Sequence, residues 1–313
     1  MQVISARDID ARLDYPSLIG ALRRAFIAGC DAPRRHRHDI PLAGGSGGIM
    51  LLKPAWRAGG PIAVKIVNIF PDNASRGLPS TLGAVMLFDG ETGAPIATIA
   101  GGALTVRRTA AASALAADFL ARKDAAILLV AGTGQLAPAL ARAHATIRPI
   151  QEIRIWARAP DKAAALARSL RAAGLAATAV GDLRSGVRDA DIVTCATLAR
   201  SPLIEGDWLK PGAHLDLVGG FTPDMREADD AAMRRGRIFV DTRDGALAEA
   251  GDLIGPIASG AITEADVLGE LSELCRGSAA GRGADDEITI FKSVGTAIED
   301  LAAAELALER CGD

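Results

Sequence analysis

Apolar residues near the start of the chain recur at a spacing that fits one face of a helix. A helical segment over residues 5–29 is predicted by Ile9, Leu13, Leu18, Leu22 and Phe26. Three short, β-rich runs follow, at residues 47–56, 61–70 and 80–101, and are divided by glycine and proline. The last run contains Asp-Gly-Glu-Thr-Gly, which is typical of a hairpin turn. We therefore expect a helix and a mainly antiparallel sheet in the N-terminal third.

Beyond about residue 105 the pattern changes to helices that alternate with short apolar strands. Helices are expected over residues 104–121, from the turn after residue 132 through Ala143, and over 161–174. The tail, residues 289–311, is expected to begin with a short extended piece and to continue as a long helix. Strands are expected at 126–132, 152–158, 177–180, 191–197, 214–220 and 237–242. Such alternation predicts βαβ units and a parallel sheet.

Composition narrows the class of protein. The chain has 313 residues and a net charge of -3, which gives no indication of a nucleic-acid partner. The N-terminus has neither a basic nor an apolar leader region, and no uncharged apolar run is long enough to span a membrane. We expect a cytoplasmic protein of two domains, or one large domain, without a membrane segment.

Cysteine and histidine do not form a recognisable metal-binding pattern. No Cys-x-x-Cys pair occurs, and the cysteines lie far apart at Cys30, Cys195, Cys275 and Cys311. A reducing compartment therefore fits better than a disulfide framework. His36 and His38 alternate in a basic segment expected to be an extended loop, either solvated or at the mouth of a pocket. With His144 and His214 they form no metal set, so no metal is expected.

The most informative local motif is a glycine turn between a predicted strand and a predicted helix. Gly132, Gly134 and Ala137 form Gly-x-Gly-x-x-Ala directly after the apolar strand. The first glycine permits a tight turn, the second lets a pyrophosphate approach the backbone, and the alanine allows close packing of helix on strand. We expect this turn, including Thr133 and Gln135, to bind a dinucleotide; the simpler alternative is an ordinary tight turn.

The strand after this turn bears on which dinucleotide is bound. It ends in Trp156, Ala157 and Arg158, where an NAD-specific site usually has an acidic residue. Arg158 can pair with a 2'-phosphate, which favours NADPH and leaves NADH possible, although a solvated surface arginine is the alternative. The later strands end near Thr197, Leu198 and Val218, which we also expect to contact the cofactor.

Several segments, in the same order, resemble the ornithine cyclodeaminase and mu-crystallin family along nearly the whole chain. They lie at residues 51–56, 63–68, 104–117, 131–137, 153–158, 211–229, 240–253 and 289–304. The resemblance implies a Rossmann-type doubly wound α/β domain at 116–289. It also implies a mainly antiparallel α+β domain for substrate binding and dimerisation at 1–115, to which segment 290–313 returns, and hence a homodimer.

The resemblance also assigns roles to individual residues. Lys65 corresponds to the family lysine beside the substrate carboxylate, and Arg108 to the arginine that spans substrate and cofactor. An arginine of the basic segment, Arg35 or alternatively Arg37, completes the anion clamp. Ser80 stands where the family has a small hydroxyl near the ligand, and Lys53 replaces a frequent methionine, adding a charge or facing solvent. Thr109 and Ser293 are expected at the cofactor.

One departure from the cyclodeaminase changes the expected chemistry. Phe221 follows the glycine pair where that enzyme has an aspartate that assists ornithine chemistry. Phenylalanine cannot accept a proton, so the motif is more similar to that of the ketimine reductases. Nearby Asp216 lies on a predicted strand, where a structural and a catalytic role are equally open.

These features lead to the expectation of an NAD(P)H-dependent imine reductase. Hydride transfer to the C=N bond would convert 1-pyrroline-2-carboxylate to L-proline, or the six-membered homologue to L-pipecolate. Charge-assisted hydrogen bonds from the lysine and arginine clamp would hold the substrate carboxylate. The alternatives are ornithine cyclodeaminase, alanine dehydrogenase and a mu-crystallin-like ligand-binding protein without turnover.

Overall fold

The computed structural model describes residues 1–43 and 46–311, which form two compact units. Of these residues, the first unit comprises 1–43, 46–109 and 296–311, and the second comprises 110–295. The boundaries expected from the sequence, after residues 115 and 289, fall inside helix α3 (Gly101–Leu120) and strand β14 (Ile288–Lys292). All of β14 belongs to the sheet of the second unit, so the chain returns to the first unit later than expected.

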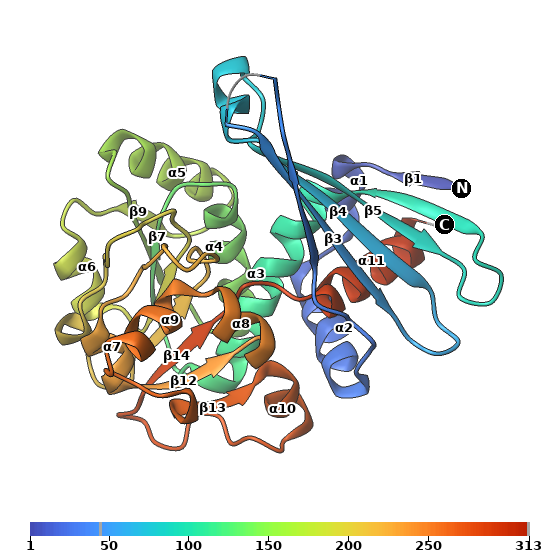
Figure 1. The fold of residues 1–313 in the computed structure, drawn as a ribbon. Coiled ribbons are helices and arrows are strands. Elements are labelled where there is room, and N and C mark those ends of the chain that lie inside the picture. The colour runs from blue at the N-terminus through green and yellow to red at the C-terminus, as the bar shows by residue number, and fades with distance from the viewer. Residues whose placement is uncertain (44–45, 312–313) are drawn as a thin grey trace. The chain divides into compact units, whose positions relative to one another are not determined.

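The first unit contains a six-stranded sheet with the order β1-β6-β5-β4-β3-β2 (Figure 1). Its strands are β1 (Gln2–Ile4), β2 (His36–Ile40), β3 (Gly48–Trp56), β4 (Ile62–Ile69), β5 (Thr81–Phe88) and β6 (Pro95–Ala100). Neighbouring strands are antiparallel except β1 and β6, which are parallel. The mainly antiparallel sheet is thus as predicted, whereas the basic segment expected to be a loop forms edge strand β2.

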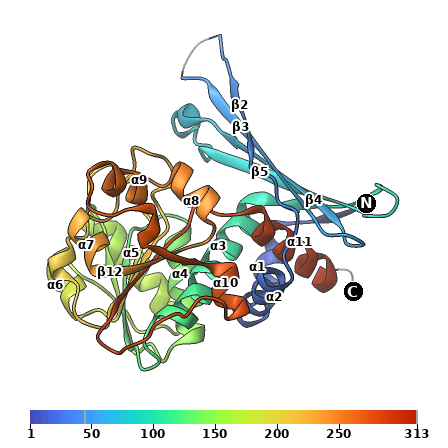
Figure 2. The same cartoon turned by 60° about the horizontal axis from the view of Figure 1, so that its bottom comes forward.

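The predicted N-terminal helix consists of two helices, α1 (Ala6–Arg12) and α2 (Tyr15–Ala28). The break has a local cause, because the Asp14 side chain accepts a hydrogen bond from the Ser17 backbone and Pro16 fits the first turn of a helix. Helix α11 (Ala297–Cys311) lies beside α2 in both views (Figures 1 and 2). A 3₁₀ segment, Pro71–Arg76, precedes β5.

The two faces of this sheet differ in their surroundings. Lys53, Ala55, Ala63, Lys65, Val85 and Ile99 are buried on the face against which α11 packs. The next residues along each strand point to the opposite face. They are mostly apolar and partly exposed: Leu52, Pro54, Trp56, Ile62, Val64, Ile66, Met86 and Phe88. We call these eight residues the open sheet face.

The second unit is built on an eight-stranded parallel sheet with the order β13-β12-β14-β11-β10-β7-β8-β9. Besides β14, its strands are β7 (Ile127–Ala131), β8 (Glu152–Trp156), β9 (Ala177–Ala179), β10 (Ile192–Cys195), β11 (His214–Leu217), β12 (Gly236–Val240) and β13 (Val267–Glu270). The chain order reverses between β7 and β10. Dinucleotides bind outside the carboxyl ends of the strands at such a switch point.

Helices cover both faces of the parallel sheet (Figure 1). One hydrophobic cluster joins the sheet to α3, α4 (Leu136–Ile147) and α5 (Pro160–Ala172). The other joins it to α6 (Leu183–Asp189), α7 (Asp230–Arg235), α8 (Arg243–Glu249) and α9 (Gly251–Ala258). Helix α10 (Leu271–Arg276) and the 3₁₀ turns Gly206–Trp208 and Glu264–Asp266 complete the unit. The doubly wound α/β fold predicted from the sequence is confirmed.

Candidate active site

The glycine turn has the geometry that its sequence predicts. Gly132 has φ 124°, and a Cβ there would lie 2.6 Å from the carbonyl oxygen of Ala196, so only glycine fits. At Gly134 a Cβ would meet no heavy atom of the described chain within 4 Å, which leaves the backbone open to a ligand. Ala137 is fully buried where α4 packs on the sheet.

The start of α4 offers donors to an anion. Gln135 stands at its N-cap without a side-chain hydrogen bond to the first turn. The first backbone N–H groups of a helix have no partner inside the helix, and its dipole favours a negative charge there. The turn and the helix start therefore fit a dinucleotide pyrophosphate.

The other expected cofactor residues of the second unit lie at the same edge of its sheet. Ala157 and the exposed Arg158 follow β8, while Thr197 and Leu198 follow β10. Val218 follows β11, and the buried Ser293 follows β14, where its backbone N–H donates to Leu217 at 3.2 Å. Thr109 belongs to α3 in the first unit. The six residues of the second unit follow four strands of the parallel sheet and lie at its carboxyl edge.

A second group of expected residues forms a buried cation cluster in the first unit. Lys53 on β3 and Lys65 on β4 are directly opposite each other, and both are at most 5% exposed. Their ammonium groups lie 2.9 Å from opposite oxygens of Asp300, on α11. Two facing lysines would repel each other, so Asp300 is what allows both to be buried.

Arg108 joins the same cluster from α3. Its Nε lies 2.9 Å from Asp300 Oδ1, and its Nη1 donates to Glu299 Oε2 at 2.5 Å. Asp300 and Glu299 are both 1% exposed. The structure therefore brings Lys53, Lys65 and Arg108 together, and it adds two carboxylates that sequence reasoning missed.

The electrostatics of the cluster follow from burial and mutual charge. Burial alone would raise the pKa of Asp300, but the charges of Arg108, Lys53 and Lys65 outweigh it and hold that pKa far below its usual range. Burial lowers the pKa of Lys65 well below its usual value, and Arg108 and Lys53 add to this lowering while Asp300 opposes it. Such strongly shifted groups are frequent at functional sites.

The remaining expected substrate residues are less tightly grouped. Arg35 is partly buried and close enough to Lys53 for its charge to lower the pKa of that lysine, after the larger effect of burial. Arg37 is exposed and pairs with Asp39 at 3.0 Å, which favours Arg35 over Arg37 for the clamp. Ser80 is exposed just before β5, and Phe221, 38% exposed, follows the glycine pair in the second unit.

Asp216 has the surroundings of a structural residue. It is fully buried on β11 and accepts hydrogen bonds from Ser113 Oγ at 3.1 Å and Thr194 Oγ1 at 2.6 Å. Its Oδ2 is also 3.3 Å from Nε2 of His144, itself fully buried. Side chains shielded from solvent in this way suit internal hydrogen bonding, so we assign Asp216 no catalytic role.

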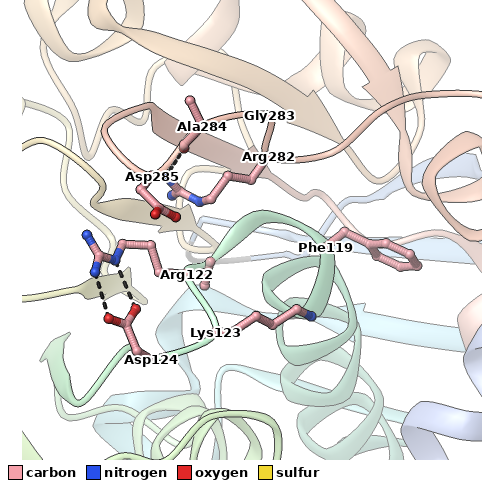
Figure 3. Close-up of a pocket in the computed structure, with 9 residues that line it drawn as sticks. Phe119, Arg122, Lys123, Asp124, Arg282, Gly283, Ala284 and Asp285 are labelled. Carbon is pink, nitrogen blue, oxygen red and sulfur yellow. Dashed lines mark hydrogen bonds and ion pairs between the residues drawn. The ribbon is translucent and has the colours of Figure 1, made fainter.

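A hollow of about 570 Å³ in the second unit is lined by none of the residues expected at the site (Figure 3). Its lining precedes β7 and β14, at the amino ends of the parallel strands. Arg122 there pairs with Asp124 at 2.6 Å, and Arg282 donates to backbone carbonyls, including Leu120 at 2.8 Å. Because these cations are already paired, we assign the hollow no role in catalysis.

Metal-binding and membrane features add nothing to the site. His36 and His38 are exposed on β2. Over the described residues, no three histidine, cysteine, aspartate or glutamate side chains are grouped as ligands of one metal ion. None of the helices in that part of the chain combines the length and hydropathy that crossing a membrane requires.

Comparison with known proteins identifies the family. The Delta(1)-pyrroline-2-carboxylate reductase of Paracoccus denitrificans is 42% identical over 304 residues, which cover 97% of this chain and 95% of that protein. The structure of the Thermococcus litoralis Delta(1)-pyrroline-2-carboxylate reductase in complex with NADH and L-proline is 34% identical, with a TM-score of 0.93 over 99% of this chain and 97% of that one. The iminosuccinate reductase of Paracoccus denitrificans in complex with NAD+ is 29% identical, with a TM-score of 0.90 over 100% and 96% of the two chains. The family model described as "Ornithine cyclodeaminase/mu-crystallin family" matches residues 3–313, and the chain therefore belongs to this family, as its sequence motifs predicted.

Proposed function

We propose that the protein is an NAD(P)H-dependent reductase of cyclic ketimine carboxylates, converting 1-pyrroline-2-carboxylate to L-proline. The buried cluster of Lys53, Lys65 and Arg108 carries this proposal, because it brings three cations of the first unit together at one place. Charge-assisted hydrogen bonds from such cations suit the binding of a small carboxylate substrate. Relatives named for this reaction support the assignment at about 40% identity.

The chain's own residues contribute binding and orientation. Arg108, Lys65 and Arg35 hold the substrate carboxylate by charge-assisted hydrogen bonds. The glycine turn and the start of α4 hold the pyrophosphate. When bound, the reduced nicotinamide supplies a hydride to the imine carbon. With uptake of one proton at the imine nitrogen, the C=N bond would become CH–NH.

A substrate panel tests this function. We expect 1-pyrroline-2-carboxylate to oxidise NADPH or NADH, as measured by absorbance at the nicotinamide band, with 1-piperideine-2-carboxylate as the six-membered comparison. Ornithine with NAD, scored by ammonia release, and pyruvate with ammonia test the cyclodeaminase and alanine dehydrogenase alternatives. Ammonia release from ornithine without net cofactor oxidation, or ligand binding without any turnover, would overturn the reductase assignment.

Arg158 bears on which of the two nicotinamide cofactors the protein prefers. We propose NADPH as the preferred cofactor because Arg158 is exposed at the end of β8, where a 2'-phosphate can reach it. Replacing Arg158 with aspartate should lower the NADPH/NADH ratio of kcat/KM by about tenfold or more, since a pairing cation becomes a repelling anion. An unchanged ratio would mean that Arg158 is only a surface charge. Arg168→Asp, on α5, serves as a charge-matched control.

We also propose that the protein is a homodimer that packs through the open sheet face. Contiguous, partly exposed apolar side chains of this kind mark interaction surfaces, and two copies of one face form a self-complementary interface. Light scattering should give about twice the 32.2 kDa chain mass for the wild type, and the monomer mass for Val64→Glu. Leu268→Glu, at a 44% exposed position in β13, should leave the dimer intact. A monomeric wild type would contradict the proposal.

We propose a cytoplasmic location. The four cysteines lie far apart along the sequence and form no Cys-x-x-Cys pair, which suits a reducing compartment.

A further inference from the structure

Three buried charged residues of the second unit have no part in the reaction proposed above. Glu227, Asp252 and Lys292 are all fully buried near the carboxyl ends of β10, β11 and β14. Burying a charged group costs free energy unless its charge and hydrogen-bonding capacity are satisfied. They lie at the same edge of the sheet as the expected cofactor residues, which points to a role in cofactor binding.

Glu227 connects the loops that follow two neighbouring strands. Its Oε1 accepts hydrogen bonds from the backbone N–H and from Oγ1 of Thr197, both at 2.7 Å. Its Oε2 accepts a hydrogen bond from the backbone N–H of Gly219, also at 2.7 Å. One carboxylate therefore fixes the chain just beyond β10 to the chain just beyond β11.

The two glycines after β11 leave room for the carboxylates of Glu227 and Asp252. A Cβ on Gly219 would lie 2.4 Å from Glu227 Oε1 and 2.1 Å from the carbonyl oxygen of Thr197. A Cβ on Gly220 would lie 2.5 Å from Asp252 Oδ2. Real Cβ atoms do not approach other atoms so closely. Any larger residue at either position would therefore clash with these neighbouring atoms, although the backbone angles themselves do not require glycine.

Asp252 and Lys292 hold Glu227 in turn. Asp252 Oδ1 accepts hydrogen bonds from the backbone N–H groups of Glu227 at 2.7 Å and Ala228 at 3.1 Å. Asp252 Oδ2 lies 3.1 Å from Nζ of Lys292, the last residue of β14. The position of Glu227 is thus tied to a third strand as well as to α9.

We infer that Glu227 is a positioning residue for the dinucleotide, holding the loops after β10 and β11 at the spacing that the nicotinamide half of the cofactor requires. This inference rests on the proposed dinucleotide site. Glu227 acts through Thr197 and Gly219, and its full burial keeps it from touching the cofactor itself. Burial raises the pKa of Glu227 to about 7, while Lys292 opposes this rise and Asp252 adds to it.

The test compares three near-isosteric variants. Glu227→Gln replaces one accepting oxygen by an NH₂ group that faces an N–H donor. Thr197→Val removes one hydroxyl bond to Glu227 and keeps the backbone N–H. Thr194→Val is the matched control. Thr194 lies on β10, three residues before Thr197, and its hydroxyl donates a comparably short hydrogen bond, at 2.6 Å, to another buried carboxylate, Asp216 on β11.

Nicotinamide fluorescence gives the Kd for NADPH and NADH, and thermal unfolding of each variant is recorded beside it. We expect Glu227→Gln to raise both Kd values by about tenfold or more and Thr197→Val by about three- to tenfold. Thr194→Val should lower the unfolding temperature with Kd unchanged within about twofold, even if Glu227→Gln fails to fold.

Two results would overturn the inference. In one, Thr197→Val and folded Glu227→Gln bind both cofactors as tightly as the wild type. In the other, Thr194→Val weakens binding as much as Thr197→Val does. If the wild type binds neither NADPH nor NADH, the proposed function fails first, and the inference with it.

Discussion

Replacing Lys65 with alanine should lower kcat/KM for 1-pyrroline-2-carboxylate by about 10²- to 10³-fold while the fold survives. Losing one partner of a buried, charged hydrogen bond to the substrate carboxylate costs about 3–4 kcal/mol, and each ~1.4 kcal/mol is tenfold. The fold should survive because Asp300 keeps Lys53 at 2.9 Å and Arg108 at 2.9 Å. Arg108→Ala should be comparably inactive but less stable, since it also removes the ion pair with Glu299.

The control for this experiment uses a second ion pair between the same elements. Arg57 follows β3 and pairs with Glu305 on α11, away from the cation cluster. Arg57→Ala should keep kcat/KM within about twofold of the wild type, since Arg57 lies outside the cluster that holds the substrate and a partly exposed ion pair contributes little to stability. Steady-state kinetics with saturating cofactor give the comparison. Near-normal kcat/KM in folded Lys65→Ala and Arg108→Ala would show that the clamp is assigned to the wrong residues.

Replacing Asp300 with asparagine should be the most destabilising conservative change in the first unit. Asparagine keeps the shape and removes the charge that Lys53, Lys65 and Arg108 share. Breaking a buried ion pair by removing one partner costs about 3–5 kcal/mol. This corresponds to a fall on the order of 10 °C in the unfolding temperature, measured by calorimetry or circular dichroism.

The pH dependence gives Asp300→Asn a second, independent readout. The folded-state pKa of Asp300 lies below its ordinary value of 3.8, so its stabilisation is complete above that value and is lost as the pH falls toward the folded pKa. The gap in stability between wild type and variant should therefore narrow below pH 3.8. Glu305→Gln, on the same helix, should lower stability by no more than about 1 kcal/mol. An equal loss in both variants would contradict a special role for Asp300.

Features formed by residues that are adjacent in the sequence could be predicted from it. The turn at Gly132 and Gly134 was readable because strand, glycines and helix are adjacent in the chain. The alternation of helices and strands likewise predicted the parallel sheet. The split between α1 and α2 was missed, although Asp14 and Pro16 are a local helix-start signal that could have shown it.

The counterions of the site could not be found in this way. Lys65 and Asp300 are 235 residues apart, and Arg108 and Glu299 are 191 residues apart. An acidic pair at the start of an alanine-rich helix is also what the helix dipole favours, so the pattern gave no reason to place Glu299 and Asp300 at the site. The same holds for Glu227, whose partners at Thr197 and Gly219 become its neighbours only when the parallel strands align.

The discontinuity of the first unit has a consequence for the growing chain on the ribosome. Lys53, Lys65 and Arg108 are synthesised before the whole second unit, and α11 with Asp300 comes after it. Because chains are synthesised at about 5–20 residues per second, Asp300 and Glu299 are added on the order of ten seconds or more after the three cations. Burying the three cations without these carboxylates is unfavourable. The core of the first unit should therefore form last, after the second unit has folded.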